Sequence, residues 1–428
     1  MYHRKHKGHL IGVFILSLIL SAGSLLAQQK ILIPMDMTQT DHLKAYGVTY
    51  WALSEGWIAD WLLNYRGGSF MLPYSEKIVL KCRLEGVAFE VVDAVTAAQI
   101  YAEVQDPNSN MDAVRLEKAA KIAVYAPPGF QPWDDAVTLA LDYAGIPYDR
   151  IWDEEILNDT LYHYDWLHLH HEDFTGQYGK FYAAFHNAPW YIQQVELNEQ
   201  MARKLGFRKV SEMKKAVVEK IRQYVASGGF MFAMCSATDT YDIAQAAMNV
   251  DICDVVYDGD PPDPHAQEKL DFSRTFAFEN FKLVMDPYQY EFSNIDIDAR
   301  TLLATAATDY FTLFEFSAKY DPVPTMLTQC HVNVIRGFLG QTTAFREELI
   351  KKSVVILGKR EGTNQVKYIH GNFGRGTFTW LGGHDPEDYQ HAVGDPPTDL
   401  NLHKNSPGYR LILNNVLFPS AKKKKQKT

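Results

Sequence analysis

Short apolar runs alternate with amphipathic segments along most of the chain after residue 28. The run KILIPMD is typical of a strand, and the helical pattern of HLKAYGVTYWALSEG follows it up to Gly56. The next segments, WIADWLLNYRGGSFML and SEKIVLKCRLEGVAFEVVD, predict strand, glycine-rich loop, helix and strand. This β-α-β-α-β order favours a parallel sheet with helices on its faces and defines an N-terminal α/β unit over residues 28–115.

A second and larger α/β unit is predicted over residues 116–420. The segment from Asp106 to Glu117 before it predicts a linker, because its Pro, Asn, Ser and Asp residues favour turns and the apolar periodicity stops. Helical patterns end at Gly145 and at the glycine pair of YVASGG. Four strands are predicted around these helices, in KIAVYAPPG, YDRIW, YDWLHLHHE and FMFAMCSAT.

The pattern becomes irregular and rich in aromatic residues from about 255 to 350, which predicts an insertion in the second unit. Regular patterning returns with a β-hairpin around GKREGTNQ and a strand through TFTWLGG. A last helix is predicted in PGYRLILNNVLF. The final segment, AKKKKQKT at 421–428, predicts a basic, disordered tail.

The first 27 residues have the layout of a secretory signal peptide. A positively charged start is followed by an apolar stretch from Leu10 to Leu20, and cleavage is expected after Ala27. A retained anchor is the alternative, but the stretch is shorter than the roughly 20 residues that a spanning helix needs. We therefore expect an exported protein, periplasmic or extracellular, without a transmembrane span.

Net charge limits the class of partner, and cysteine content limits the number of expected disulfides. The formal net charge is -10 at pH 7, and this acidity argues against nucleic acid as a partner. Four cysteines are few for an exported chain of 428 residues, so disulfides are not expected to hold the fold together. The expected partner is a small-molecule, glycan or peptide substrate, and the sequence leaves the oligomeric state undetermined.

Cys235 is the leading candidate for chemistry. In SGGFMFAMCSATDTYDIAQAA, a short apolar strand ends at Cys235 and a helix begins at once. The positive end of the helix dipole stabilises a thiolate, and parallel sheets bind ligands where their strands end. A buried structural cysteine is the alternative. Asp239, in the same helix, is a further candidate for contact with a substrate.

A later strand delivers the segment GGHDPED, which contains His384 and Glu387. A thiol nucleophile needs a base within hydrogen-bond reach and an acid that orients this base, and these two residues supply both groups. In these features the chain resembles the class I glutamine amidotransferase-like superfamily. The resemblance implies a flavodoxin-like parallel sheet with flanking helices, with Cys235 as nucleophile, His384 as base and Glu387 as the residue that orients it.

Over nearly its whole length the chain also resembles a group of exported bacterial proteins labelled asparagine synthetase B. The resemblance lies in MDMTQTDHLKAYGVTYWAL, WLLNYRGGSF, HHEDFTGQYGKFY and FAMCSATDTYDIA. An asparagine synthetase would use an N-terminal Cys and an SGGxDS-type loop for ATP. This chain has Gln28 after the expected cleavage site, and its nearest loop is Ser227–Phe230. ATP-dependent asparagine synthesis is therefore not expected.

The segment HYDWLHLHHEDFTGQYGKFY is dense in histidine and acidic residues. It predicts a substrate-binding loop after a strand of the sheet that carries Cys235, with five candidate residues: His168, His170, His171, Glu172 and Asp173. No cofactor is predicted. A divalent metal on His168 and His170 is the alternative, because residues two apart in a strand share a face. Arg66, beside paired glycines, is a candidate for binding an anionic group, and a surface turn is its alternative.

Three functions follow from these features. The first is a Cys-dependent amide or acyl hydrolase or transferase that uses Cys235, His384 and Glu387. The second is a non-catalytic scaffold of the same fold that binds envelope glycan or protein. The third is a metal-dependent hydrolase centred on His168 and His170.

Overall fold

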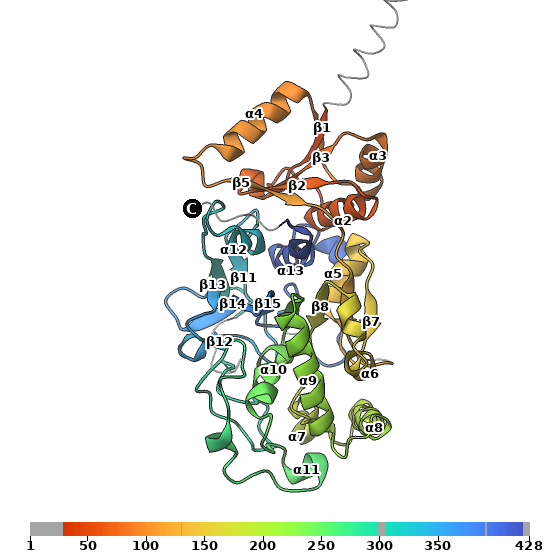
Figure 1. Ribbon diagram of the computed structural model, residues 1–428, viewed down its shortest axis with the longest axis vertical. Helices are drawn as coiled ribbons and strands as arrows, with labels where there is room; N and C mark the ends of the chain where they lie inside the picture. Colours follow the sequence, from red (N-terminus) through yellow and green to blue (C-terminus); the bar gives the residue numbers. More distant parts are fainter. Residues whose placement is uncertain (1–28, 130, 298–304, 390–391, 423–428) are drawn as a thin grey trace, which may run out of the picture.

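The computed structural model describes residues 29–129, 131–297, 305–389 and 392–422. The expected signal peptide, residues 1–27, and residues 423–428 of the expected tail lie outside these ranges. Within them, two sheets with helices between and around them form a mixed α/β structure (Figure 1). No helix of these ranges is both long enough and apolar enough to cross a membrane.

The first sheet belongs to the N-terminal unit. Its strands are β1 (Lys30–Ile33), β2 (Ala59–Leu63), β3 (Ser69–Pro73), β4 (Glu90–Val92) and β5 (Asp112–Leu116), in the order β4-β1-β3-β2-β5. Every neighbouring pair is antiparallel, so the prediction of a parallel sheet is wrong for this unit. A five-residue turn, residues 64–68, joins β2 to β3, whereas a parallel crossover needs about a dozen residues or more.

Three helices accompany this sheet: α2 (His42–Ser54), α3 (Glu76–Glu85) and α4 (Ala94–Gln105). Each begins at a side chain that accepts a hydrogen bond from a backbone N–H of the first turn, namely Asp41, Ser75 and Asp93. Helix α4 packs on one face of the sheet through Ile100 and Val104. Figure 1 shows α4 at the outer end of the molecule and α2 on the side of the second sheet.

The predicted linker, Asp106–Glu117, contains the edge strand β5, which pairs with β2. Val114 and Leu116 alternate with the more exposed Ala113 and Arg115, but the strand is too short for this alternation to stand out in the sequence. The first two residues of the predicted tail also belong to the fold. Ala421 pairs with Leu116, and the backbone N–H of Lys422 donates to the Arg115 carbonyl at 2.8 Å.

The second sheet has ten strands in the described residues. They are β6 (Ile122–Tyr125), β7 (Asp149–Ile151), β8 (Trp166–Leu169), β9 (Phe230–Met234), β10 (Tyr310–Leu313), β11 (Val334–Arg336), β12 (Phe345–Arg346), β13 (Val355–Lys359), β14 (Gln365–Phe373) and β15 (Gly376–Leu381). The strands β7-β6-β8-β9-β15 are parallel in that order, and β14, β13, β10 and β11 continue the sheet antiparallel. The sheet is therefore mixed, and its parallel part contains the strands predicted from residues 116–240.

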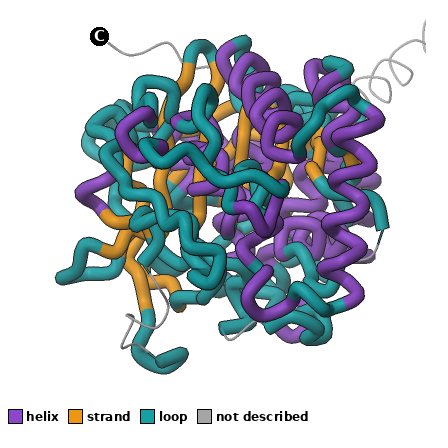
Figure 2. Tube along the Cα trace, turned by 90° about the horizontal axis from the view of Figure 1, so that it is seen from below, coloured by secondary structure: helices purple, strands orange, loops and turns teal. Residues whose placement is uncertain are grey.

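Helices cover both faces of the parallel strands. Helices α5 (Ala136–Ala144) and α13 (Pro407–Leu417) share one core with α2 and the first sheet, whereas α9 (Val210–Ala226) and α10 (Ser236–Ala246) share the other. The side chains of β9 alternate between them, with Phe232 in the first core and Met231 in the second. The other α-helices of the described residues are α6 (Asp153–Leu157), α7 (Tyr182–Phe185), α8 (Pro189–Lys204), α11 (Val255–Asp258) and α12 (Pro322–Leu327). Figure 2 shows helices and long loops around the strands.

The carboxyl ends of the parallel strands meet at one edge of the sheet. In register, Leu381 of β15 lies beside Met234 of β9, and Leu169 of β8 lies beside Ala233. The residues that come after these strands, among them His170 and Cys235, therefore emerge side by side. This is the edge at which open α/β sheets bind ligands.

Candidate functional site

Cys235 forms the turn between β9 and α10, at the position that the sequence predicted. Its backbone angles are φ 52° and ψ -143°. A positive φ is strained for a residue with a side chain, by about 1–3 kcal/mol, and such strain clusters at functional sites. The sharp turn places the thiol at the edge of the sheet, beside the first turn of α10.

A cavity of about 250 Å³ is lined by both Cys235 and His384. The backbone N–H of Cys235 donates to the Gly383 carbonyl at 3.2 Å, which holds the segment after β15 against the turn after β9. His384 follows Gly383 directly, and its side chain is buried. The two distant segments that the sequence singled out, one with a thiol and one with an imidazole, line one cavity.

Burial dominates the electrostatics of the thiol. It raises the pKa of Cys235 to about 11, although backbone N–H groups of Gln341, Ser236 and Thr342 oppose this by lowering it. The thiol is therefore neutral at pH 7. The same N–H groups face the sulfur, so they also face any negative charge that develops beside it.

Gln341 and Thr342 belong to a loop at residues 338–343, inside the segment predicted as an insertion. This loop packs tightly on the His384 segment, because a Cβ atom on Gly340 would lie 2.8 Å from the His384 nitrogen. The Thr342 hydroxyl donates to Asp239 at 2.9 Å. The sequence reasoning did not find this loop, and its one local signal is the glycine in FLGQTT.

Asp239 lies under this loop as a buried carboxyl group. Burial raises its pKa to about 7, and hydrogen bonding to Thr342 lowers it only in part. Its second oxygen, Oδ2, is buried without a hydrogen-bond partner in the described residues. Asp239 is therefore placed to fix the loop that covers Cys235.

Three histidines cluster beside the cavity. The rings of His170 and His171 lie 3.9 Å apart between centroids, and His384 lies 4.6 Å from His170 and 4.5 Å from His171. One nitrogen of each ring lies within 4.8 Å of the others, which is a spacing that could hold a metal ion. The buried Nε2 atom of His170 has no hydrogen-bond partner in the described residues, and His170 Nδ1 lies 3.2 Å from Asp135. A carboxylate behind a histidine is a common second layer of zinc sites.

His168 points to the same side as His170, as predicted, but it lies deeper in the sheet. Its Nε2 atom is 3.2 Å from both oxygens of Asp135, and its ring stacks on Trp166 and Phe232. Burial lowers the pKa of His168, although the neighbouring Asp135 opposes this shift. The structure places His168 behind the site rather than at the cavity.

Glu387 lies close to the site but is bonded elsewhere. Its carboxylate forms an ion pair with His403 at 3.1 Å. Glu387 does not line the cavity that Cys235 and His384 share. Asp385, between them, accepts a hydrogen bond from the Tyr409 hydroxyl at 2.8 Å. The arrangement therefore does not give Glu387 the orienting role that the sequence predicted.

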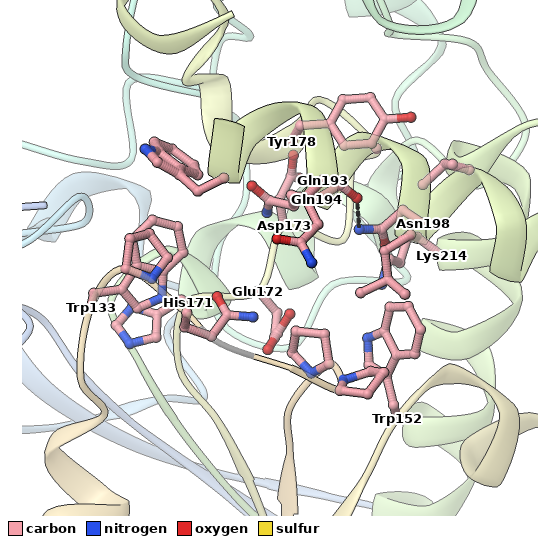
Figure 3. Close-up of a pocket in the computed structure, with 18 residues that line it drawn as sticks. Trp133, Trp152, His171, Glu172, Asp173, Tyr178, Gln193, Gln194, Asn198 and Lys214 are labelled. Atoms are coloured by element: carbon pink, nitrogen blue, oxygen red, sulfur yellow. Dashed lines mark hydrogen bonds between the residues drawn. The ribbon is translucent and has the colours of Figure 1, made fainter. Parts of the chain in front are cut away.

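A second cavity, of about 110 Å³, adjoins the first one. The two share Trp133 and His171, and the second contains Glu172 and Asp173 of the predicted substrate loop. Figure 3 shows the Glu172 carboxylate in the middle of this cavity, with Trp133 and Trp152 on opposite sides. Burial raises the pKa of Glu172 to about 8.

Asp173 plays a structural part in this loop. Its carboxylate accepts hydrogen bonds from the backbone N–H groups of Thr175, Gln177 and Gly179 at 2.7–3.0 Å. These bonds fold the loop after β8. Both carboxylate oxygens of Asp173 therefore accept hydrogen bonds from the loop itself, and we do not expect them to contact a substrate.

Arg66 lies in the first unit, away from the two cavities. Its guanidinium donates to Asp36 at 2.7 Å and to Glu90 at 2.8 Å. Two carboxylates already neutralise it, so the turn interpretation fits the structure better than an anion site does.

Sequence reasoning missed a second pairing of cysteine and histidine. Cys330 Sγ lies 3.8 Å from His331 Nδ1, and the buried Arg410 lies beside them. All four cysteines are free thiols, and Cys330 is more exposed than the buried Cys82, Cys235 and Cys253. The sequence around Cys330 has no pattern that marks it as reactive. Because Cys330 is the most exposed of the four thiols, thiol-labelling experiments on Cys235 need a variant without it.

No family model matches the chain, and no curated protein matches it. Among solved structures, the cytoplasmic protein STM3548 of Salmonella typhimurium matches with TM-score 0.36 and 12% identity, over 71% of this chain and 100% of the other. STM1381 of the same organism gives 0.32 and 10% over the same shares. A β-galactosidase from Bacillus circulans sp. alkalophilus gives 0.26 and 10%, over 67% of this chain and 32% of the enzyme. We base no assignment on TM-scores of this size.

Proposed function

We propose that the protein is a Cys-dependent hydrolase or transferase that acts on an amide or related acyl carbon. The observation that carries the proposal is the single cavity shared by Cys235, on its strained strand-to-helix turn, and His384. A thiol and an imidazole at one cavity are the two groups that nucleophilic acyl transfer requires.

The fold supports a member of the class I glutamine amidotransferase-like superfamily. Numbered along the chain from β6, the parallel strands run in the order 2-1-3-4-5, which is the flavodoxin-like order. The nucleophile comes after the fourth of these strands and the histidine after the fifth, as the resemblance implies.

In the proposed reaction, His384 removes the thiol proton while the Cys235 sulfur attacks the carbonyl carbon of the substrate. The backbone N–H groups of Gln341, Ser236 and Thr342 stabilise the negative oxygen of the tetrahedral intermediate. The C–N bond then breaks, and the amine leaves with the proton from His384. Water, or an acceptor amine, attacks the thioester in the same way and releases the acyl group and the free thiol.

The high pKa of Cys235 favours general-base catalysis over a preformed thiolate. A thiol with a pKa of about 11 does not form a stable thiolate–imidazolium pair at pH 7. Proton transfer to His384 therefore accompanies attack, as general-base catalysis.

The test of the proposal uses a C330S background, because Cys330 is the more exposed thiol. Chloroacetamide alkylation followed by peptide mapping should modify Cys235, whereas C330S/C235S should show no label there. Release of ammonia or amine from a panel of amides should be lost in C235S and kept in C330S. No labelling of Cys235 and equal amide turnover with and without it would end the proposal.

The opposing hypothesis is a non-catalytic scaffold that binds envelope glycan or protein. The burial of Cys235, which is 4% exposed, is the observation in its favour. It predicts an unreactive Cys235 and a stable partner in envelope extracts.

A metal-dependent hydrolase is the other candidate, and the cluster of three histidines supports it. His170, His171 and His384 would hold the ion, with Asp135 behind His170. This replaces the predicted pair His168 and His170 by a different set. Elemental analysis of the purified protein for Zn, Mn and Fe, with H170A as control, separates this candidate from the Cys-dependent enzyme. A stoichiometric metal that H170A loses supports the metal-dependent hydrolase.

Export is part of the proposal, because its basis lies in residues 1–27. Mass spectrometry of the mature protein should find Gln28 as its first residue. A chain that retains residues 1–27 would contradict it.

A further inference from the structure

The cavity around Glu172 has the chemistry of a cation-binding site. Figure 3 shows the Glu172 carboxylate directed into the space between Trp133 and Trp152. Among the described residues, Glu172 is bonded through its backbone carbonyl, which accepts from the Thr240 hydroxyl at 2.9 Å. Its carboxylate has no hydrogen-bond or ion-pair partner in that part of the chain.

The charged groups next to Glu172, Lys214 and Asp173, already have bonding partners, whereas the Glu172 carboxylate has none in the described residues. Lys214 Nζ lies 2.9 Å from Asp153 and donates to the Tyr125 hydroxyl at 2.9 Å. Asp173 accepts hydrogen bonds from three backbone N–H groups. Lys214 also lines this cavity, but its ammonium group is bonded to Asp153 and Tyr125, so the Glu172 carboxylate is left to pair with a proton or with a cation from outside.

Indole rings supply the rest of the site. Trp133, Trp152 and Trp190 line the cavity, and Trp133 packs edge to face on Trp190 at 5.4 Å between centroids. The faces of tryptophan rings attract cations, and aromatic walls with a carboxylate are a recurring way to bind ammonium groups. The Nε1 atoms of Trp133 and Trp152 are buried without a hydrogen-bond partner in the described residues, so the cavity also offers donors to a polar ligand.

The position of the Glu172 cavity connects it to the proposed reaction at Cys235. Trp133 and His171 line both spaces, so the Glu172 cavity is the direct neighbour of the cavity that contains Cys235. The first turn of α10 connects them further, because the Ala237 N–H donates to the His170 carbonyl at 3.0 Å.

We propose that Glu172 and the indoles of Trp133 and Trp152 bind an ammonium group of the substrate, which is therefore an amide that also carries a free amine. This inference rests on the proposed function for its reaction, but the ammonium site itself is independent of Cys235. An amino-acid amide and the first residue of a peptide are two sources of this chemistry.

The first experiment measures binding without chemistry. Ethylammonium chloride is titrated into the full chain at about pH 8.5, with tryptophan fluorescence as readout and sodium chloride as the salt control. We expect saturable quenching that E172Q weakens at least about tenfold and that E196Q, an exposed acid on α8, leaves unchanged. Equal titrations of wild type and E172Q would overturn the ammonium site, as would saturation by N-acetylglucosamine in place of ethylammonium.

The second experiment connects the site to Cys235. In a C330S background, methanethiosulfonates with an ethylammonium, an ethylsulfonate or an uncharged methyl group form a mixed disulfide with the thiol and release methanesulfinate. We expect the cationic reagent to modify Cys235 at least about tenfold faster than the anionic one, and E172Q to remove most of this preference without changing the uncharged rate. Similar rates for all three reagents would overturn the connection. Failure of all three to modify Cys235 would instead contradict the proposed function, and the titration would still decide the ammonium site.

Discussion

The backbone N–H of Cys235 donates a hydrogen bond to the Gly383 carbonyl at 3.2 Å, although 148 positions separate the two residues in the chain. This bond joins the turn after β9 to the turn after β15. It brings the thiol and the His384 imidazole to one cavity, so the stability and the reactivity of the Cys235 turn should depend on this arrangement.

The strained turn at Cys235 should be visible in stability. Glycine adopts φ 52° without the clash that a side chain makes, so C235G should unfold at a higher temperature than C235A. We expect its free energy of unfolding to be higher by about 1 kcal/mol, because the entropy cost of glycine offsets part of the relieved strain. Thermal and urea unfolding of the two variants measure this. C235A as the more stable variant would mean that the turn is not strained at this residue.

The loop at residues 338–343 should be needed for the reactivity of Cys235. In G340A the new Cβ would clash with the backbone of Gly383 and His384, and overpacking of this kind costs about 1–3 kcal/mol. We expect slower alkylation of Cys235 together with lower stability. G358A is the matched control, because a Cβ on Gly358 would also crowd its neighbours, at 3.2 Å, but lies on β13 and outside the cavity. Equal alkylation in G340A and G358A would show that the loop does not shape the site.

Glu387 should be dispensable for chemistry. E387Q removes the ion pair with His403, which costs less than about 1 kcal/mol for partly exposed groups. Alkylation of Cys235 should therefore remain at the rate of the parent. A loss as large as the loss in H384N would restore Glu387 to the orienting role predicted from the sequence.

Asp239 should make the protein less stable as the pH rises. Its folded pKa of about 7 lies above the unfolded value of 3.8, so its contribution is most favourable below pH 4 and is lost as the pH rises through 7. At about 1.4 kcal/mol per pKa unit, the loss is on the order of 4 kcal/mol. D239N cannot ionise, so its melting temperature should fall less than that of the wild type between pH 4 and pH 8. Parallel pH profiles would contradict the shifted pKa.

The sequence was sufficient for the local elements of the second unit. The helix that stops at Gly145, the helix that ends just before the glycine pair Gly228 and Gly229, the strand before Cys235 and the hairpin around GKREGTNQ are all present, because periodicity and glycine stops act over a few residues. The placement of Cys235 and His384 at one cavity was also predictable, since both were expected directly after strands of one sheet.

Long-range pairing could not be predicted in the same way. The direction of the strands in the first sheet depends on which strands pair, and the helical patterns between them suggested parallel crossovers. Glu387 binds His403, which reaches it from a separate segment. The N–H groups of Gln341 and Thr342 reach the thiol from an irregular segment whose sequence has no periodicity.

The most direct test of the account is the rate at which chloroacetamide alkylates Cys235, compared between C330S and C330S/H384N at pH 7. A neutral thiol reacts only as its proton leaves, and a positioned base contributes about 10²–10⁴-fold to such steps. We therefore predict that loss of His384 slows alkylation of Cys235 at least about tenfold, with folding unchanged by circular dichroism. Equal rates in the two proteins would show that the imidazole does not act on the thiol, and would contradict the proposed pair.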